Sequence, residues 1–421
     1  MNSTRTTRRD FLGKTIVTGI GIAAGLRAAA FGGVAKASYD TGITATVGIT
    51  KGPDRSDNAF RAMQLFKNQI ATAIGNKRVV IKPNLVWWSD ACACTRVEHL
   101  DGILEFLKSI GKRDVVIAES SPQGDIMAGY DAKGYLNLTK KYPVKLMDLN
   151  QEGFANVQIW KYGNSSYVTG SDTVNTLQTI RVSKLYLNPN NFIISAAPMK
   201  THNTVLVTLA TKNVAMSAPV VDIGNGGSWL QPGSRGDKGS MHGPKGAPSG
   251  TGSNSTYDYQ VLNDNVYQMV KVHGIHPHLA VTDGYQGVDH QGPVGGQLIP
   301  TPKQLAVASL DWLAADRIAL TLMGTNVYVT LNQTSDGHNM PFPACLNYIW
   351  QASQQLLAAG KPGLGEWDDR KIQVIGDIGN MTGDNLVGNS NVYQYVAHTY
   401  QTGGFETAGI ATSPRDITPR T

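Results

Sequence analysis

The stretch NFIISAAPMKTH, residues Asn191–His202, joins an apolar, β-branched run to a polar end. A near-continuous apolar run of this length is typical of a strand that is buried on both faces of a sheet. Lys200 and His202 follow the run directly. Open α/β sheets bind their ligands beyond the carboxyl ends of the strands. The stretch therefore predicts a buried strand that leads into a binding site.

The same pattern occurs at five other places along the chain. The runs are RVVIKPN (78–84), DVVIAESS (114–121), HLAVTDG (278–284), QLAVASLD (304–311) and KIQVIGD (371–377). Several are separated by patterns typical of amphipathic helices, such as VEHLDGILEFLKSIG before DVVIAESS. Strands that alternate with helices indicate an α/β fold, with a mostly parallel β-sheet flanked by helices. We place this domain at residues 38–380, followed by a C-terminal extension at 381–421.

A glycine-rich insertion at residues 217–256 interrupts the predicted domain. Residues 224–252 hold ten glycines in 29 positions. Long loops are often functional, and this one carries charge at Arg235, Lys238, His242 and Lys245. Two interpretations stay open: a solvated loop, or a mobile lid that closes over a bound anion.

The first 37 residues are typical of a twin-arginine signal peptide. The paired arginines of TTRRDFLGK (6–14) precede an apolar run from Thr15 to Leu26, and AKA (35–37) matches a small-residue cleavage site. The apolar run is too short for a stable membrane anchor. We therefore expect a periplasmic or secreted protein that the twin-arginine export machinery carries in its folded state. A basic disordered tail is the alternative interpretation.

Most of the net charge comes from this N-terminal segment. Residues 1–37 contain six of the 37 Lys and Arg and one of the 31 Asp and Glu, which leaves 31 basic and 30 acidic residues, a net charge of +1. A nucleic-acid binder is expected to carry a basic field over its surface. We therefore expect no nucleic-acid partner.

The chain has three cysteines, Cys92, Cys94 and Cys345. Three cysteines cannot supply the four ligands of an iron–sulfur cluster, so no such cluster is expected. An oxidising compartment permits a disulfide from Cys345 to Cys92 or Cys94. The spacing alone does not decide between bridged and inert thiols.

Five motifs in order resemble the domain-of-unknown-function 362 family. They are VVIKPNLV, PMKTHNTVLVTLATKNVAM, VTDGYQGVDHQGPVGGQ, VASLDWLAAD and GLGEWDDRKIQVIGD, between Val79 and Asp377. The resemblance implies no particular activity, because the family has none assigned in general. Some members carry ferredoxin-like modules, whose cysteines this chain lacks. In the third motif, Asp289 and His290 replace a common Glu and Gly. A histidine often follows the family's Lys-Asn motif, and His242 is its best match here.

Lysines at strand ends would attract a carboxylate or a phosphate. Burial and mutual repulsion can lower the pKa of such a lysine and make it a base or a Schiff-base nucleophile. A histidine beside them serves as an acid–base group or a metal ligand, and Asp side chains ligate hard cations. We assign the candidate residues as follows: catalytic, Lys200, His202 and Lys212; substrate-binding, Lys82, Asn84, Asn213, Asp283 and Asp311; metal-ligating, His202, His242 and Asp283.

A second candidate metal motif is His-x-x-His-x-His at His273, His276 and His278. Its place before the strand at 278–284 puts it at the amino end of that strand, away from the predicted site. The chain has no G-x-G-x-x-G, Walker A or G-x-S-x-G motif at a strand–helix junction, which disfavours nucleotide binding and serine hydrolysis.

These features predict an exported enzyme that binds a small anionic substrate with a divalent metal or a preloaded cofactor. Proton abstraction beside a carboxylate, as in racemisation or isomerisation, fits the Lys and His residues. A distant likeness to nickel-pincer lactate racemases rests on fold type and the mixture of Lys and His residues alone. The main alternative is a non-catalytic periplasmic protein that binds an anion or a metal chelate. A scaffold or surface protein is a third class, which leaves the charged strand ends unexplained.

Overall fold

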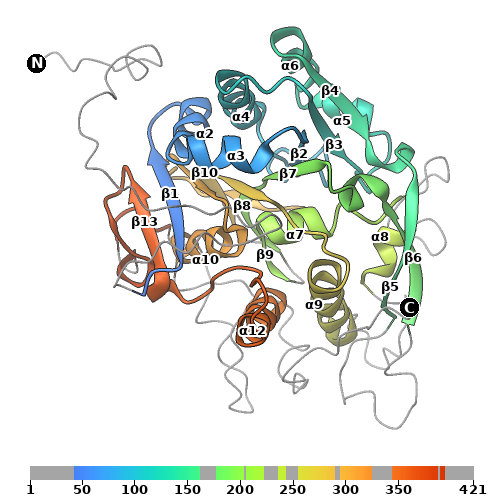
Figure 1. Cartoon of the computed structure of the whole chain (residues 1–421). Helices are drawn as coiled ribbons and strands as arrows, with labels where there is room; N and C mark the ends of the chain where they lie inside the picture. The colour runs from blue at the N-terminus through green and yellow to red at the C-terminus, as the bar shows by residue number, and fades with distance from the viewer. Residues whose placement is uncertain are drawn as a thin grey trace, which may run out of the picture.

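The computed structural model describes residues 42–161, 177–202, 205–221, 236–242, 255–289, 294–324, 344–386 and 389–393. The predicted signal peptide, His290, and most of the glycine-rich insertion and the C-terminal extension lie outside these residues. Figure 1 shows an α/β fold with one large sheet and helices against both of its faces.

The large sheet follows the order β14-β13-β1-β12-β10-β7-β2-β3-β4. The bounds are β14 (Met381–Thr382), β13 (Ile372–Gly376), β1 (Ala45–Lys51), β12 (Leu305–Ser309), β10 (Leu279–Asp289), β7 (Asn191–Ala196), β2 (Arg78–Pro83), β3 (Val115–Glu119) and β4 (Val144–Asp148). Neighbours from β10 to β4 are parallel, whereas β12 is antiparallel to both β10 and β1. The predicted mostly parallel α/β fold is confirmed.

Three short strands extend this sheet, and two more form a separate ribbon. These are β8 (Pro198–His202), β9 (Leu206–Thr208) and β11 (Gln297–Leu298), and the ribbon of β5 (Phe154–Trp160) and β6 (Leu177–Ser183). The stretch that opened the sequence analysis thus forms two strands, β7 and β8. β7 pairs with both β2 and β10, and β8 continues along β10. The polar end of the stretch lies beyond the point where β2 ends.

The helices form two layers, and each layer comes from one half of the chain. Those of the first half are α2 (Arg55–Gln64), α3 (Lys67–Ile74), α4 (Val97–Ser109), α5 (Ile126–Ala132) and α6 (Leu136–Lys141). Those of the second half are α7 (Ala210–Ala215), α8 (Gly236–Ser240), α9 (Ser255–Lys271), α10 (Trp312–Met323) and α12 (Ala344–Ala358). Short 3₁₀ turns lie at η1 (Leu149–Gln151), η3 (Lys184–Leu187), η4 (Asp369–Lys371) and η5 (Gly383–Leu386).

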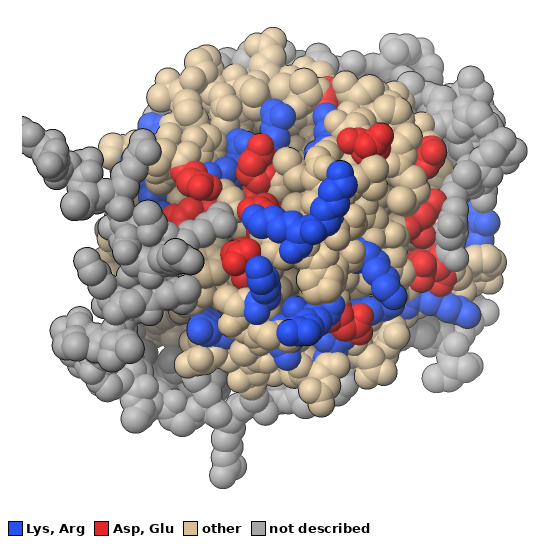
Figure 2. All heavy atoms as spheres, turned by 90° about the horizontal axis from the view of Figure 1, so that it is seen from above, with Lys and Arg blue, Asp and Glu red and all other residues tan. Residues whose placement is uncertain are grey.

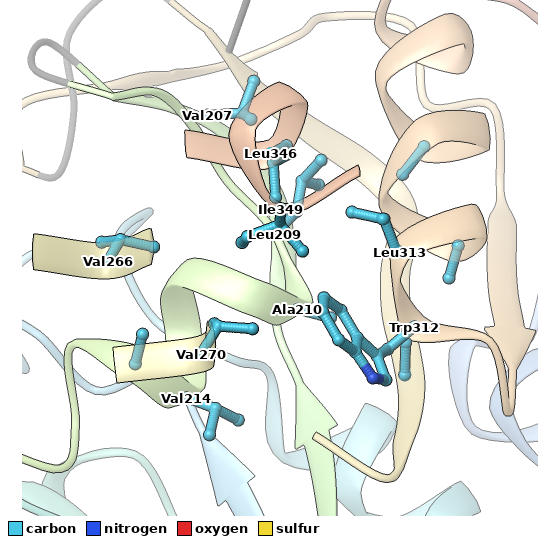
Figure 3. Packing of buried hydrophobic residues seen from close by; sticks show 14 of the residues in the cluster. Val207, Leu209, Ala210, Val214, Val266, Val270, Trp312, Leu313, Leu346 and Ile349 are labelled. Atoms are coloured by element: carbon cyan, nitrogen blue, oxygen red, sulfur yellow. The ribbon is translucent and has the colours of Figure 1, made fainter. Parts of the chain in front are cut away.

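Each face of the sheet has its own apolar core. Val79 and Ile81 pack with α2 and α4, whereas Val80 packs with α7, α9 and α10. Figure 3 shows this second core, where side chains from β9, α7, α9, α10 and α12 converge. Successive side chains of a strand point to opposite faces, so a strand covered on both faces must be apolar at every position. The continuous runs in the sequence are a direct consequence.

Part of the predicted C-terminal extension packs on the domain. β14 pairs antiparallel with β13. Tyr393 is fully buried, and its hydroxyl donates to the carbonyl of Gly284 over 2.8 Å. Among the described residues, no helix is both long and apolar enough to cross a membrane.

Candidate functional site

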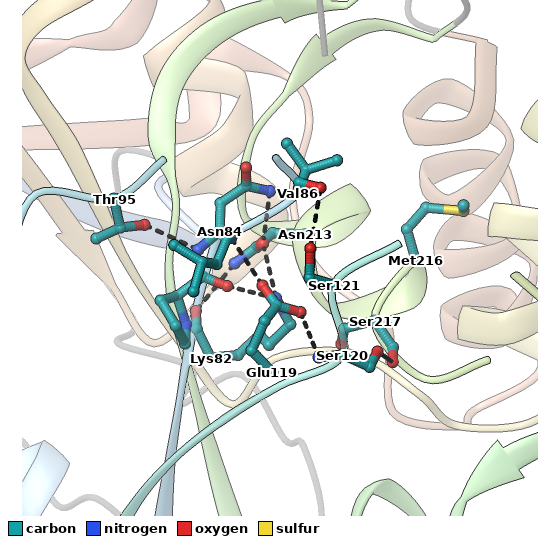
Figure 4. A network of polar contacts seen from close by, with 12 residues as sticks. Lys82, Asn84, Val86, Thr95, Glu119, Ser120, Ser121, Asn213, Met216 and Ser217 are labelled. Carbon is teal, nitrogen blue, oxygen red and sulfur yellow. Dashed lines mark hydrogen bonds and ion pairs between the residues drawn. The ribbon is translucent and has the colours of Figure 1, made fainter. Parts of the chain in front are cut away.

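Lys82 and Glu119 form a buried ion pair at the ends of two neighbouring parallel strands, β2 and β3. The Lys82 Nζ lies 2.6 Å from Glu119 Oε2, and the two side chains are 2% and 4% exposed. Glu119 also accepts backbone N–H bonds from Leu85 and Ser120, each 2.8 Å long. Figure 4 shows these contacts. Both carboxylate oxygens of Glu119 therefore have hydrogen-bond donors from the protein.

Asn213 connects α7 to these strand ends. Its Nδ2 donates to the Lys82 carbonyl and to Ser195 Oγ, each over 3.0 Å, and its Oδ1 accepts from Asn84 Nδ2 at 3.0 Å. The Asn84 Oδ1 in turn accepts from Lys200 Nζ at 2.9 Å. These bonds join two of the five sequence motifs. We call the set Lys82, Asn84, Glu119, Lys200 and Asn213 the polar network.

Four lysines from four elements lie close enough to affect one another electrostatically. The pKa of Lys212 is lowered by burial and by repulsion from Lys200, Lys238 and Lys82. We call Lys82 of β2, Lys200 of β8, Lys212 of α7 and Lys238 of α8 the lysine cluster. All four are buried. On the outer face seen in Figure 2, by contrast, basic and acidic side chains are interspersed. The lysine cluster is therefore distinct from the mixed charges on this outer face.

Lys238 brings the glycine-rich insertion into the site. Its Nζ donates to Ser120 Oγ over 3.1 Å and to the Met216 carbonyl over 2.5 Å. The neighbouring Asp237 holds α8 to β6 through an ion pair with Arg181, with 2.6 Å between Oδ2 and Nε. This described part of the insertion is thus docked on the domain through side-chain contacts.

Lys212 differs from the other three lysines in that its amine has no partner among the residues that the structure describes. The residue is 9% exposed. Within the described part of the chain, no hydrogen bond or ion pair involves its Nζ, whereas Lys82, Lys200 and Lys238 each donate to protein oxygens. Burial, and then repulsion from Lys200 and Lys238, holds the pKa of Lys212 well below its usual range. A neutral amine at this position is therefore favoured.

Burial also lowers the pKa of the other lysines, to different extents. It lowers the pKa of Lys200 to about 8 and that of Lys238 to about 7. The pKa of Lys82 is lowered by burial as well, although Glu119 opposes the change. Lys200 therefore keeps much of its positive charge at neutral pH, and Lys238 keeps about half.

His202 ends β8 next to the lysine cluster. It is buried, and burial, followed by repulsion from Lys212 and His242, holds its pKa well below the usual range. The Nδ1 accepts the backbone N–H of Val205 over 3.3 Å. His242, which follows α8, is half-buried and close enough to affect His202. The structure thus brings His202 and His242 toward the lysines.

Asp283 does not join the lysine cluster. It shares a sheet face with Val281, whose side chain packs in the core formed with α2 and α4. There its Oδ1 lies 3.3 Å from the Nε of Arg55, and it accepts the N–H of Tyr285 over 3.1 Å. Lys82 points to the other face because it has the parity of Val80 in β2. The predicted shared site therefore excludes Asp283.

Asp311 lies near the amino ends of the parallel strands, opposite the ends where the lysine cluster lies. Because β12 runs antiparallel to β10, its last residue, Ser309, pairs with Ala280 near the start of β10. The Asp311 carboxylate caps α10 and accepts N–H groups from Ala314 and Glu366, each over 3.0 Å. Burial raises its pKa to about 7. Its surroundings make it a structural residue rather than a substrate ligand.

The predicted metal ligands are not assembled. His202 and His242 lie near the lysines, while Asp283 faces the other core. Across the described ranges, no three His, Cys, Asp or Glu side chains are grouped as metal ligands. Cys92, Cys94 and Cys345 are free thiols.

The three histidines of the His-x-x-His-x-His motif make packing contacts, and the rings of His276 and His278 lie 5.9 Å apart. The ring of His276 stacks on Trp312, and that of His278 stacks on Phe192, each with 5.2 Å between ring centroids. His273 Nε2 contacts the Gln158 carbonyl over 2.7 Å.

Asp316, the last residue of the VASLDWLAAD motif, was not assigned to the candidate site, yet it positions α7. Its Oδ1 accepts the N–H of Ala210 over 2.8 Å and its Oδ2 accepts that of Thr211 over 2.9 Å. Leu209, at the N-cap of this helix, supplies no side-chain cap. Glu119 and Ser120 were recognisable as polar residues at a strand end. No local pattern links Asp316 to a helix that lies so far away in the sequence.

The fold and the site define an α/β protein in which a buried lysine cluster lies where the central parallel strands end. The chain belongs to the family described as Domain of unknown function (DUF362), whose model matches residues 79–321, more than half of the chain. No curated protein matches it. Among solved structures, it is similar to a Thermotoga maritima protein determined by the Northeast Structural Genomics Consortium. The identity is 13% and the TM-score 0.37, over 65% of this chain and 60% of that one.

Proposed function

We propose that the protein binds a small anionic molecule, a carboxylate or a phosphate, at the lysine cluster. The observation that carries the proposal is the buried Lys212, whose Nζ has no hydrogen-bond partner among the described residues. A buried polar group without a partner is unfavourable, so a ligand that supplies the missing contact would be bound tightly. Lys200 and Lys238, which retain charge, would pair with its anionic group.

The same residues support an enzyme that moves a proton. A neutral amine at Lys212 and a neutral imidazole at His202 are both bases. Either one would take a proton from the carbon next to a carboxylate, while Lys200 stabilises the negative charge that develops. Racemisation and isomerisation both need a base and a cation that stabilises the developing negative charge. Because the predicted metal ligands do not assemble, the proposal assigns them no metal.

A non-catalytic anion-binding protein is the second candidate. It is favoured by the way Lys82, Lys200 and Lys238 are fixed by protein oxygens, which gives a rigid donor set. The two candidates differ in one measurement. An enzyme would exchange the hydrogen next to the carboxylate of a bound 2-hydroxy acid with solvent deuterium, whereas a binding protein would return the ligand unlabelled.

Isothermal titration of the full chain with phosphate and with L-lactate tests the binding proposal. We expect saturable binding of at least one anion by the wild type and its loss in Lys212→Met. The matched control is Lys361→Met, which removes an exposed lysine and should leave binding unchanged. Equal affinity in Lys212→Met, or no binding of either anion, would refute the proposal.

The cellular location is part of the same proposal. The paired arginines at Arg8 and Arg9 support export of the folded protein, so the anion would be one found in the periplasm or outside the cell. The twin-arginine route permits a cofactor to be loaded before export, but the proposal does not require one.

A further inference from the structure

The lysines of the cluster divide into two kinds. Lys200 donates to Asn84 Oδ1 and to the Ala93 carbonyl, and Lys238 donates to Ser120 Oγ and the Met216 carbonyl. Lys212 has no such acceptor within the described part of the chain. A lysine that serves as an anion clamp needs its charge, whereas an uncharged amine has a lone pair available for reaction. The arrangement therefore separates two lysines that are held by protein oxygens from one amine that is left available for reaction.

We infer that Lys212 forms a Schiff base with a small anion that carries a carbonyl group, such as a 2-oxo acid. This inference rests on the proposed function, because the charged lysines must hold the anionic group for the carbonyl carbon to reach Lys212. Desolvation and neighbouring cations are the two conditions that activate a lysine in this way, and Lys212 meets both. Lys200 and Lys238 supply the cations, and burial supplies the desolvation.

The step is balanced without an oxidant or a reductant. The Lys212 nitrogen lone pair attacks the carbonyl carbon, a C–N bond forms, and the C=O π electrons move to oxygen. One amine proton then transfers to that oxygen, which gives a carbinolamine. A second proton, from the ammonium group of Lys200 or Lys238, converts the hydroxyl into a leaving water, and the C–O bond breaks as the nitrogen lone pair forms the C=N bond. The product is a C=N bond with a protonated nitrogen. This cation withdraws electrons from the adjacent carbon, which makes a proton there easier to remove and connects the adduct to the proposed proton transfer.

Charged and titratable groups on several other elements act on Lys212. Lys200 and His202 come from β8, Lys238 from α8, Lys82 from β2 and Cys345 from α12. The lysines lower the pKa of Lys212, and the Cys345 thiol opposes them. Exposed lysines keep a pKa of about 10.4 and are protonated at pH 7, so a reaction at this pH selects for Lys212.

Reductive trapping of the full chain tests the inference. The protein is incubated at pH 7 with pyruvate, and separately with glyoxylate, in the presence of cyanoborohydride, and modified peptides are mapped by mass spectrometry. We expect one adduct per chain at Lys212, absent with L-lactate and suppressed by phosphate. The exposed Lys361 is the internal reference. Lys212→Arg, which keeps a long nitrogen-bearing side chain but has no amine to form a Schiff base, and Lys212→Met should both lose the adduct.

The outcomes separate this inference from the proposed function. Phosphate or L-lactate binding with no adduct at Lys212 from either carbonyl probe would overturn the inference and leave the binding proposal intact. Labelling of Lys361 at the same rate as Lys212 would likewise overturn the Schiff-base inference but not the binding proposal. If neither anion binds and no adduct forms, both the binding proposal and the Schiff-base inference are refuted. Because the site is mapped on the wild type, the result does not depend on whether a variant folds.

Discussion

Lys212 is the residue at which the sequence conflicts with ordinary packing rules. A lysine that is buried without a partner costs folding free energy, because its amine loses water and gains no hydrogen bond in return. Conflicts of this kind are expected at functional sites. The neighbouring Asn213 shows the usual arrangement, since its amide group is fully engaged by the polar network.

Lys212→Met should therefore stabilise the protein. Methionine keeps the length of the side chain and removes the desolvated amine, so we expect the free energy of unfolding to rise by about 1–3 kcal/mol. Urea unfolding at pH 7 without added anions measures the change. Lys361→Met should stay within about 0.5 kcal/mol of the wild type. A loss of stability in Lys212→Met would mean that the amine makes a favourable contact in the folded protein.

Glu119→Gln should have the opposite effect. It leaves the Lys82 ammonium buried without its ion-pair partner, which costs roughly 3–5 kcal/mol of unfolding free energy. The double variant with Lys82→Met removes the stranded charge and should recover most of the loss. The two free energies from urea unfolding check this prediction, and equal instability of the single and double variants would contradict it.

At the scale of elements, α7 depends on α10 for its start. The Asp316 carboxylate of α10 satisfies two N–H groups in the first turn of α7, the helix that carries Lys212 and Asn213. Amide groups at a helix start need acceptors. Burial raises the pKa of Asp316 to about 6, so the carboxylate is mostly charged at neutral pH and suits this role.

Asp316→Asn should lower stability and anion affinity together. Asparagine offers one acceptor oxygen and turns its NH₂ toward the other N–H, which costs about 1–3 kcal/mol, and the displaced helix carries Lys212 with it. Asp311→Asn is the matched control, because it weakens the cap of α10 at the opposite edge of the sheet. We expect a similar stability loss there with unchanged anion binding by calorimetry. Equal loss of binding in both variants would show that α7 is not specifically positioned by Asp316.

Six strands of the large sheet were predictable from the sequence, but the antiparallel direction of one of them, β12, was not. Apolar runs marked β2, β3, β7, β10, β12 and β13 because each strand is covered on both faces. An apolar run has the same pattern in either direction, so the sequence did not indicate that β12 is antiparallel. Asp311 was therefore predicted at the end of the sheet that holds the lysine cluster, whereas it lies at the opposite end. A run apolar at every position also gives no sign of which face a residue occupies, which is why Asp283 was grouped with Lys82.

At the scale of the whole molecule, the export prediction concerns residues outside the described structure. Arg8→Lys with Arg9→Lys keeps the charge but removes the paired arginines that the route recognises. We expect the precursor to accumulate inside the cell, as measured by immunoblots of cell fractions. The single variant Lys14→Arg is a charge-matched control that should be exported normally. An undiminished periplasmic level of the double variant would rule out the twin-arginine route.

The lysine cluster should also set how stability depends on pH. Lys200 and Lys238 have pKa values of about 8 and about 7 in the folded protein, below the ordinary value of about 10.4 in the unfolded chain. Between pH 7 and pH 8 the unfolded chain therefore binds more protons than the folded protein. Stability rises with pH wherever this holds. Asp311, whose pKa is about 7, acts in the opposite direction by a smaller amount.

We expect the free energy of unfolding to increase from pH 7 to pH 8, with Lys238 contributing about 1 kcal/mol of the rise. Ordinary histidines titrate below this interval, and ordinary thiols and tyrosines titrate above it. Urea unfolding at the two pH values measures the difference. Lys238→Met should reduce the rise by about that amount, while Lys361→Met should not, and the effect of Asp311 is the same in all three proteins. A rise that is unchanged in Lys238→Met would mean that Lys238 keeps its ordinary pKa and is not desolvated in the folded protein.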